Sequence, residues 1–174
     1  SNAYREADKT AQEIDCPAEK YIDLLWKYGI FLNDYAYYKE ALEVDLRFIQ
    51  LSEETNGQNE TTAKAYNCLG CDYNNLGNYD KALEHHNKAL EIRKDVLGEN
   101  HRYTATSYNN IGNVYDDLGD YDKALEYHNK ALEIRKDVLG ENHPDTAGSY
   151  NNIGNIYNNL GDYDKALEYH NKAL

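Results

Sequence analysis

A 42-residue repeat constrains this chain more than any other feature of its sequence. The stretch from Thr104 to Leu132 returns from Thr146 to Leu174, and 25 of its 29 positions are identical. A third copy begins 42 residues earlier, at Thr62. A fixed period of about 20–50 residues is typical of repeat arrays, in which each unit packs only on its neighbours. The sequence therefore predicts stacked copies of one small unit rather than a single globular core.

Each unit has the pattern of two helices separated by a glycine. Before Gly119, large residues and one glycine recur at helical spacing, at Tyr108, Ile111, Gly112 and Tyr115. After Gly119, a second helical stripe follows at Ala124, His128, Ala131 and Arg135. A helix commonly ends in a left-handed residue, for which glycine is favoured. The unit is therefore predicted to be an antiparallel pair, helix A then helix B, whose close contact is made by small residues.

The same spacing resembles the tetratricopeptide repeat family, which places a large aromatic, a Leu-Gly, a Tyr and two alanines at these positions. The 42-residue period and the long second helix resemble its kinesin-light-chain-like subclass. The sequence departs from the family pattern in two ways. The terminal proline of the 34-residue form is absent, and histidine replaces the usual aromatic of the second helix at His86, His128 and His170. The resemblance spans roughly residues 20–174 and implies an all-α, right-handed superhelical solenoid of four helix pairs, the last truncated.

The repeat also predicts where the chain divides. Residues 17–60 form a diverged first repeat, and the later repeats occupy 61–102, 103–144 and 145–174. Residues 4–16 are expected to be an N-terminal extension or a short helix, and residues 1–3 have the form of a tag-removal scar. The third repeat continues beyond the point that matches Leu174, so the natural chain is expected to continue as well.

Composition and charge argue against several functional classes. A formal net charge of −13 disfavours nucleic acid and anionic membranes as partners. No apolar run approaches the ~20 residues that cross a bilayer. Three cysteines do not make a disulfide framework, which favours a reducing, cytoplasmic setting. No nucleophile–base set, phosphate loop or metal cluster is evident, so we expect no enzyme activity, no cofactor and no metal.

Helix A carries a second stripe that is rich in asparagine, a mediocre helix former whose recurrence calls for an explanation. The family resemblance implies that this face lines the concave side of the array. Because a carboxamide both donates and accepts hydrogen bonds, it matches a peptide backbone. We therefore predict a groove for an extended peptide, lined by the asparagine stripe: Asn67, Asn74, Asn109, Asn110, Asn113, Asp117, Asn151, Asn152, Asn155 and Asn159. If these residues bond only a partner, their replacement by alanine leaves stability unchanged or improved.

The partner is expected to be a neutral or basic protein or peptide. Lys27 and Lys64 are the only cations near the stripe, whereas Asp116 and Asp117 add negative charge. Other interpretations stay open. The asparagines are a solvated filler copied by duplication, or the array is a spacer or self-associates through its repeat ends within a larger signalling protein. A more remote alternative is a thiol redox role for Cys68 and Cys71.

The histidines fall into two sets. One per repeat, at His86, His128 and His170, is predicted to be packed and hydrogen-bonded between units, because their even spacing spreads them along the array. His101 and His143 precede helix A and are predicted to cap it, and Pro144 suits a first helical position.

Overall fold

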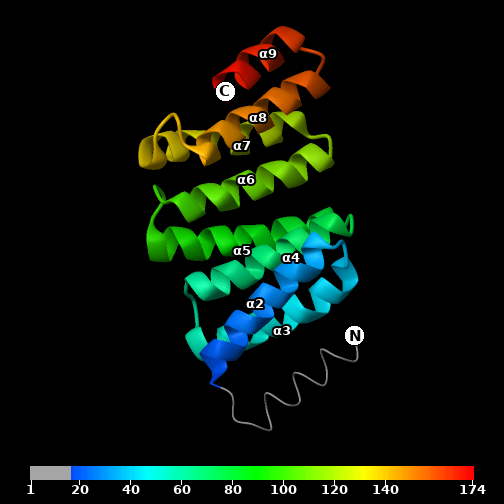
Figure 1. The fold of residues 1–174 in the computed structure, drawn as a ribbon, viewed down its shortest axis with the longest axis vertical. Helices are drawn as coiled ribbons and strands as arrows, with labels where there is room; N and C mark the ends of the chain where they lie inside the picture. Colours follow the sequence, from blue (N-terminus) through cyan, green and yellow to red (C-terminus); the bar gives the residue numbers. More distant parts are fainter. Residues whose placement is uncertain (1–16) are drawn as a thin grey trace. The chain divides into compact units, whose positions relative to one another are not determined.

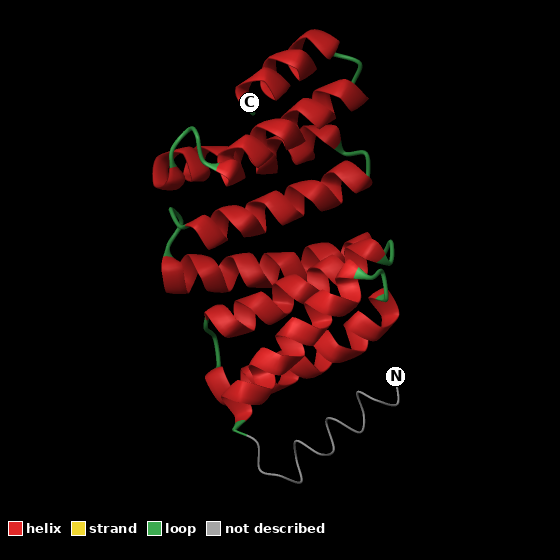
Figure 2. Ribbon diagram, viewed as in Figure 1, coloured by secondary structure: helices red, strands yellow, loops and turns green. Residues whose placement is uncertain are grey.

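Helices account for all the regular structure in residues 17–174, the part of the chain that this computed structural model describes. Figure 1 follows them along the chain, and Figure 2 shows only helices and connecting loops in that part. They are α2 (Ala18–Asp34), α3 (Tyr38–Asn56), α4 (Glu60–Asn75), α5 (Tyr79–Leu97), α6 (Arg102–Asp117), α7 (Tyr121–Leu139), α8 (Pro144–Asn159) and α9 (Tyr163–Lys172). Each predicted repeat therefore supplies one helix A and one helix B. The short helix predicted near residues 4–14 lies outside the described residues.

Polar side chains fix where several helices begin. The side chains of Asn59, Asp120 and Asp162 each accept a hydrogen bond from the backbone N–H three residues later. His101 and His143 accept from the N–H two residues later, at 3.2 and 3.0 Å, which confirms their predicted capping role. Such caps satisfy an N–H group that the first helical turn leaves unpaired. Helix α8 starts at Pro144, also as predicted.

The turn between helix A and helix B of each repeat contains a left-handed residue. In the three later repeats it is Gly77, Gly119 or Gly161, with φ of 74°, 75° and 78°. The first repeat has Ala36 there, with φ of 60°, and no other non-glycine residue among 17–174 has a positive φ. A Cβ atom disfavours this conformation, so the first turn is the more strained one.

The chain falls into two compact units, residues 1–92 and 93–174, and each is described by itself. In the first unit α2, α3 and α4 pack around Leu25, Val44, Phe48 and Leu69, each at most 2 % exposed. Phe48 stands at the position that holds alanine in the later repeats, at Ala89 and Ala131, so the first repeat has a bulkier side chain at this helix contact.

In the second unit α6 packs against α7, α7 against α8 and α8 against α9. Ala124 and Ala131 are completely buried, which confirms them as the small residues of the close helix contact. Tyr108 and Tyr115 lie on either side of Tyr127, with ring centroids 6.2 and 5.5 Å from it. Small residues thus let the helices approach while tyrosines fill the space beside them.

Two buried arginines join helix B to the next helix A in the second unit. Arg135 Nη1 donates to Ser149 Oγ at 2.7 Å and to the Asp145 carbonyl at 3.1 Å. Arg93 Nη1 donates in the same way to Ser107 Oγ at 2.8 Å. Because a guanidinium remains protonated, a buried one needs hydrogen-bond acceptors such as these. The sequence placed Arg135 on an inward stripe but did not reveal this role.

The repeated histidine packs within a helix pair rather than between pairs. A Cβ atom built on Gly112 would lie 2.9 Å from the His128 ring, so the imidazole covers the glycine of its own helix A. No hydrogen bond reaches His128 Nδ1 within the described chain, so the predicted hydrogen-bonded, inter-unit role is wrong for this residue. Burial, followed by the charge of Arg135, lowers the pKa of His128 to about 4. The imidazole is therefore neutral near pH 7.

Candidate peptide-binding face

The asparagine stripe of the second unit runs along α6 and α8. Its members differ in exposure. Asn109, Asn110 and Asn152 are half-buried, and the exposed members are Asn113, Asp117, Asn151, Asn155 and Asn159. Equivalent residues are 42 positions apart, so each level of the stripe presents one side chain from each of the two helices. The predicted residues of this unit therefore share one face of neighbouring A helices.

Some of these amides bond each other rather than pointing to solvent. Asn152 Nδ2 donates to Asn109 Oδ1 at 2.9 Å, and Arg135 Nη1 reaches the same oxygen at 3.4 Å. Farther along, Asn159 Nδ2 donates to Asp116 Oδ1 at 3.4 Å. These bonds tie α8 to α6 directly. Replacing Asn109 removes an intramolecular acceptor, so the expectation that alanine leaves stability intact does not hold at this position.

Asn151 lies at the edge of the same face. Its Oδ1 lies 3.2 Å from His170 Nδ1, a ring nitrogen whose role as donor or acceptor depends on the tautomer. This contact links helix A and helix B of the fourth repeat. Asn151 is thus partly engaged inside the protein.

Asn113 and Asn155 are the stripe residues that stay available. Both side chains are exposed, and within residues 17–174 neither amide is engaged by another side chain or by the backbone. They occupy equivalent positions on α6 and α8, one turn beyond the Asn109–Asn152 bond. Two carboxamides at equivalent positions of α6 and α8 therefore have their donors and acceptors open to a ligand.

The first unit carries the remaining stripe residues on α4, with a different arrangement. Asn67 and Asn74 are half-buried, and each interacts with another part of the protein. Next to them, Asn75 Nδ2 donates to Asn33 Oδ1 at 3.1 Å, and Asn33 Nδ2 donates to Asp72 Oδ1 at 2.6 Å. Here too amides link one helix A to the next.

A hollow of about 270 Å³ opens on the helix A face of the first unit, at the opposite end from these amides. Its lining is Glu19, Ile22, Asp23, Trp26, Phe48, Thr61 and Lys64. Lys64 Nζ lies 5.1 Å from the centroid of the Trp26 ring, a cation–π contact. Trp26 precedes Gly29 by the same three residues that separate Asn109 from Gly112. Sequence reasoning missed this hollow, although the repeat register points to Trp26.

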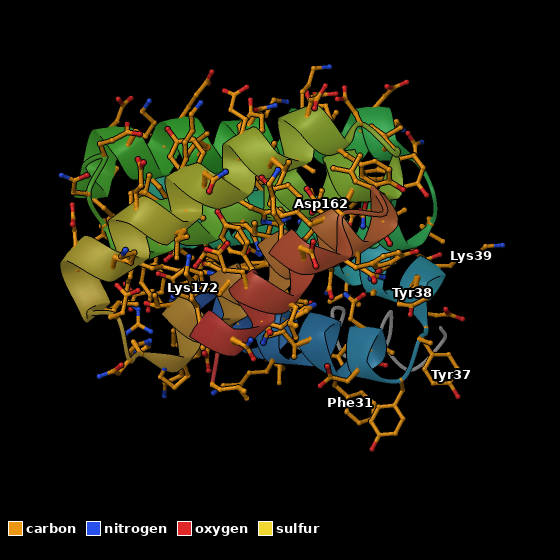
Figure 3. The ribbon with its side chains drawn as sticks, turned by 90° about the horizontal axis from the view of Figure 1, so that it is seen from above. Phe31, Tyr37, Tyr38, Lys39, Asp162 and Lys172 are labelled. Atoms are coloured by element: carbon orange, nitrogen blue, oxygen red, sulfur yellow. The ribbon has the colours of Figure 1, made fainter. Side chains whose placement is uncertain are left out.

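Both ends of the described array expose apolar side chains. On α2, Leu24, Phe31 and Tyr35 are 55 %, 51 % and 64 % exposed, and Figure 3 shows Phe31 pointing away from the ribbon. The later residues at the position of Phe31 are Asp72, Val114 and Ile156, each at most 1 % exposed. On α9, Leu167 is 63 % exposed. Terminal repeats of solenoids expose the faces that internal repeats bury.

Neither thiol chemistry nor metal binding gains support from the geometry. Cys68 and Cys71 are half-buried and are not joined by a disulfide. Within residues 17–174 no group of three or more His, Cys, Asp or Glu side chains is arranged to hold a metal ion. In the same range no helix is long and apolar enough to cross a membrane.

Stacked helix pairs with a polar ladder along their A helices define a helical-repeat scaffold. The sequence pattern of the Tetratricopeptide repeat family matches residues 61–137 and 117–174, and the chain belongs to this family. Such repeats generally mediate protein–protein interaction and generally serve as non-enzymatic scaffolds.

Solved structures of several proteins are similar to this chain. BtubC (BKLC) from P. vanneervenii is 26 % identical, with a TM-score of 0.82 over 98 % of this chain and 68 % of its own. MamA is 26 % identical, with a TM-score of 0.66 over 98 % of this chain and 84 % of its own. A Podosopora anserina protein with kinesin-light-chain, nearly identical TPR-like repeats is 17 % identical, with a TM-score of 0.76 over 87 % and 72 %. This last likeness concerns the fold. No curated protein matches the chain.

Proposed function

We propose that the asparagine stripe binds an extended segment of a partner protein, mainly through the partner's backbone. The observation that carries this proposal is the pair Asn113 and Asn155, exposed and unengaged at equivalent positions of α6 and α8. A carboxamide pair can donate to a carbonyl and accept from an N–H of the same extended chain. Within the stripe, Asn109 and Asn152 then fix the spacing of the two helices, and Asn113 and Asn155 bind the partner's backbone.

The partner is proposed to be neutral or basic. The chain has a net charge of −13, and Asp117 is exposed on the stripe itself. An acidic segment would be repelled, whereas a basic one would be drawn in at low ionic strength. In the first unit, the hollow beside Trp26 is lined by apolar Ile22 and Phe48, which suits an apolar side chain of the partner. Its charged lining is mixed, because Lys64 faces Glu19 and Asp23, and Asp23 is already paired with Lys27 at 2.6 Å. A cytoplasmic setting stays a prediction.

The test is to select binders from an unbiased library of unstructured peptides and to measure their affinity by fluorescence anisotropy. Asn113→Ala with Asn155→Ala should weaken binding of the selected peptides by roughly 5- to 150-fold, because two neutral hydrogen bonds of about 0.5–1.5 kcal/mol each are lost. The matched control is Asn129→Ala with Asn171→Ala. These two asparagines are also 42 residues apart, but they lie on helix B rather than on helix A. Equal affinities for both double variants would refute a peptide site on the stripe.

A second candidate function is a spacer or self-associating module of a larger protein. The observation in its favour is the exposed apolar face of Leu24, Phe31 and Tyr35 on α2. An array that uses its ends in this way should sediment as larger species with rising concentration, and Phe31→Asp should abolish that trend. The thiol role of Cys68 and Cys71 has only their sequence spacing to support it.

A further inference from the structure

Two carboxyl groups meet in the core of the first unit, where α2, α3 and α4 come together. Asp45 of α3 and Asp72 of α4 are both 0 % exposed. The two carboxyls lie close enough to influence each other's pKa, and Asp45 Oδ1, Asp45 Oδ2 and Asp72 Oδ2 have no hydrogen-bond partner within residues 17–174. A Cβ atom built on Gly29 of α2 would collide with Asp45 Oδ1, so the carboxyl fills the space above the glycine completely. We call Asp45 and Asp72 the carboxyl pair.

Burial of these two carboxyls requires a proton. No hydrogen-bond donor of the described chain reaches either oxygen of Asp45. A carboxylate can only accept, so two ionised aspartates cannot bond each other, whereas one added proton can be donated from one carboxyl to the other. Two bare negative charges buried in contact without a cation would cost far more than one shared proton. The pair therefore holds a proton when the unit is folded at neutral pH.

No positive charge from residues 17–174 replaces that proton. From α2 the groups facing the pair are the Gly29 backbone and the Asn33 amide, which donates to Asp72 Oδ1 at 2.6 Å. From α3 and α4 the ionisable groups are the two aspartates themselves, and no lysine, arginine or histidine is among the groups that shift their pKa values. Asn33 in turn accepts from Asn75 Nδ2 at 3.1 Å, and Asn75 is exposed.

We propose that Asp45 and Asp72 share a proton that holds α3 against α4, and that loss of this proton loosens the contact between the first two helix pairs. The effect reaches the surface through Asn33, whose amide donates to Asp72 and accepts from Asn75. The first unit is thereby sensitive to alkaline pH. This inference stands on the core of residues 17–92 and does not depend on peptide binding.

The direction of the pH response follows from the two carboxyls. Burial, then the neighbouring Asp72, raises the pKa of Asp45 to about 9, and burial raises the pKa of Asp72 to about 6. Both lie above the value of about 3.9 in an unfolded chain, so the folded unit binds more protons. The stabilisation is complete below pH ~4, declines as pH rises through about 6, and is lost as the last proton leaves near pH 9.

The experiment follows thermal unfolding of the whole 174-residue chain from pH 5 to pH 9.5. Wild type should lose roughly 5 °C or more over this range. Asp45→Asn places a permanent N–H donor against Asp72 and should remove most of that loss. Asp34→Asn is the control, because it deletes the same charge at an exposed position of the same unit. Equal slopes for Asp45→Asn and Asp34→Asn overturn the proposal.

A second measurement needs no variant. Infrared spectra of wild type at pH 7 should show the C=O stretch of a protonated carboxylic acid, which should vanish towards pH 10. The side-chain amide NMR signals of Asn33 and Asn75 should shift over the same pH range, while that of Asn113 stays constant. Absence of a protonated carboxyl band at pH 7 would overturn the proposal even if Asp45→Asn failed to fold.

Discussion

One position of the repeat is filled in opposite ways in the first and third repeats. In the first repeat, the side chain that covers the glycine of helix A is Asp45, and its neighbour from the next helix A is Asp72. In the third repeat the same position holds His128, and the next helix A supplies Ile156. The carboxyl pair needs a proton to be buried, whereas the imidazole must lose one.

The difference shows that one backbone arrangement accepts two kinds of ionisable core group with opposite pH preferences. Alkali removes the proton that the carboxyl pair requires. Acid places a charge on His128 beside the positive Arg135. The first repeat should therefore weaken in alkali and the third repeat in acid, and stability of the whole chain should be greatest in between.

The largest expected effect is the acid response of the second unit. The pKa of His128 is lowered to about 4, against about 6.5 when unfolded, so the stabilisation is complete above pH 6.5 and is lost as pH falls towards 4. The loss amounts to roughly 3 kcal/mol. Chemical denaturation at pH 7 and pH 4 measures it. His128→Phe should remove much of this loss, and an unchanged slope in that variant would show that His128 is not the sensitive group.

A somewhat smaller effect is expected from replacing the buried Arg135, which the first repeat lacks. Arg135→Met should destabilise by about 1.5–3 kcal/mol, because Ser149 Oγ and the Asp145 carbonyl lose a charged donor. The first repeat has Ser52 at the equivalent place, and no partner reaches its Oγ within residues 17–174. Ser52→Ala should be neutral or stabilising. Urea midpoints compare the two, and a larger loss for Ser52→Ala would contradict the assignment.

The glycines test how firmly each covering group is held. Gly29→Ala and Gly112→Ala should each destabilise by about 1–3 kcal/mol through overpacking. We expect Gly29→Ala to be the worse, because the added Cβ would lie 2.3 Å from Asp45 Oδ1 but 2.9 Å from the nearest His128 ring atoms. Melting temperatures at pH 7 give the ranking. The reverse order would indicate that the carboxyl pair moves aside more easily than the His128 ring.

The smallest effect concerns the amides that link successive A helices. Asn33→Ala removes the donor to Asp72 and the acceptor for Asn75, and should cost about 1–1.5 kcal/mol. Asn159→Ala removes only an exposed, 3.4 Å bond to Asp116 and should change stability by less than about 0.5 kcal/mol. Denaturant titrations at pH 7 distinguish these values. Equal costs would mean that the bond to the carboxyl pair contributes nothing.

Local patterns of the sequence predicted the helices and their ends. The repeat period, the apolar spacing around Tyr108 and the capping roles of His101 and His143 were all confirmed. Each of these depends on residues within a few turns of one another, where helix geometry fixes the distances. The place of the stripe on helix A was predictable for the same reason.

The sequence predicted which face of helix A carries the candidate site, but not which residues of that face stay available to a partner. The sequence could not separate Asn109, which accepts from Asn152, from Asn113, which stays exposed, because both are asparagines at groove spacing. That distinction depends on the separation of two helices whose residues lie 43 positions apart. The hollow beside Trp26 likewise needs side chains from three helices.

The sequence by itself determined the repeat unit, its helix pairs and its family. Only the tertiary structure decided that Asp45 meets Asp72 and that His128 covers Gly112. A helix period says which side chains face inward, but not which inward side chain of the next helix they touch. Protonation depends on that contact, since a buried charge is tolerated only where a partner atom lies within hydrogen-bonding distance.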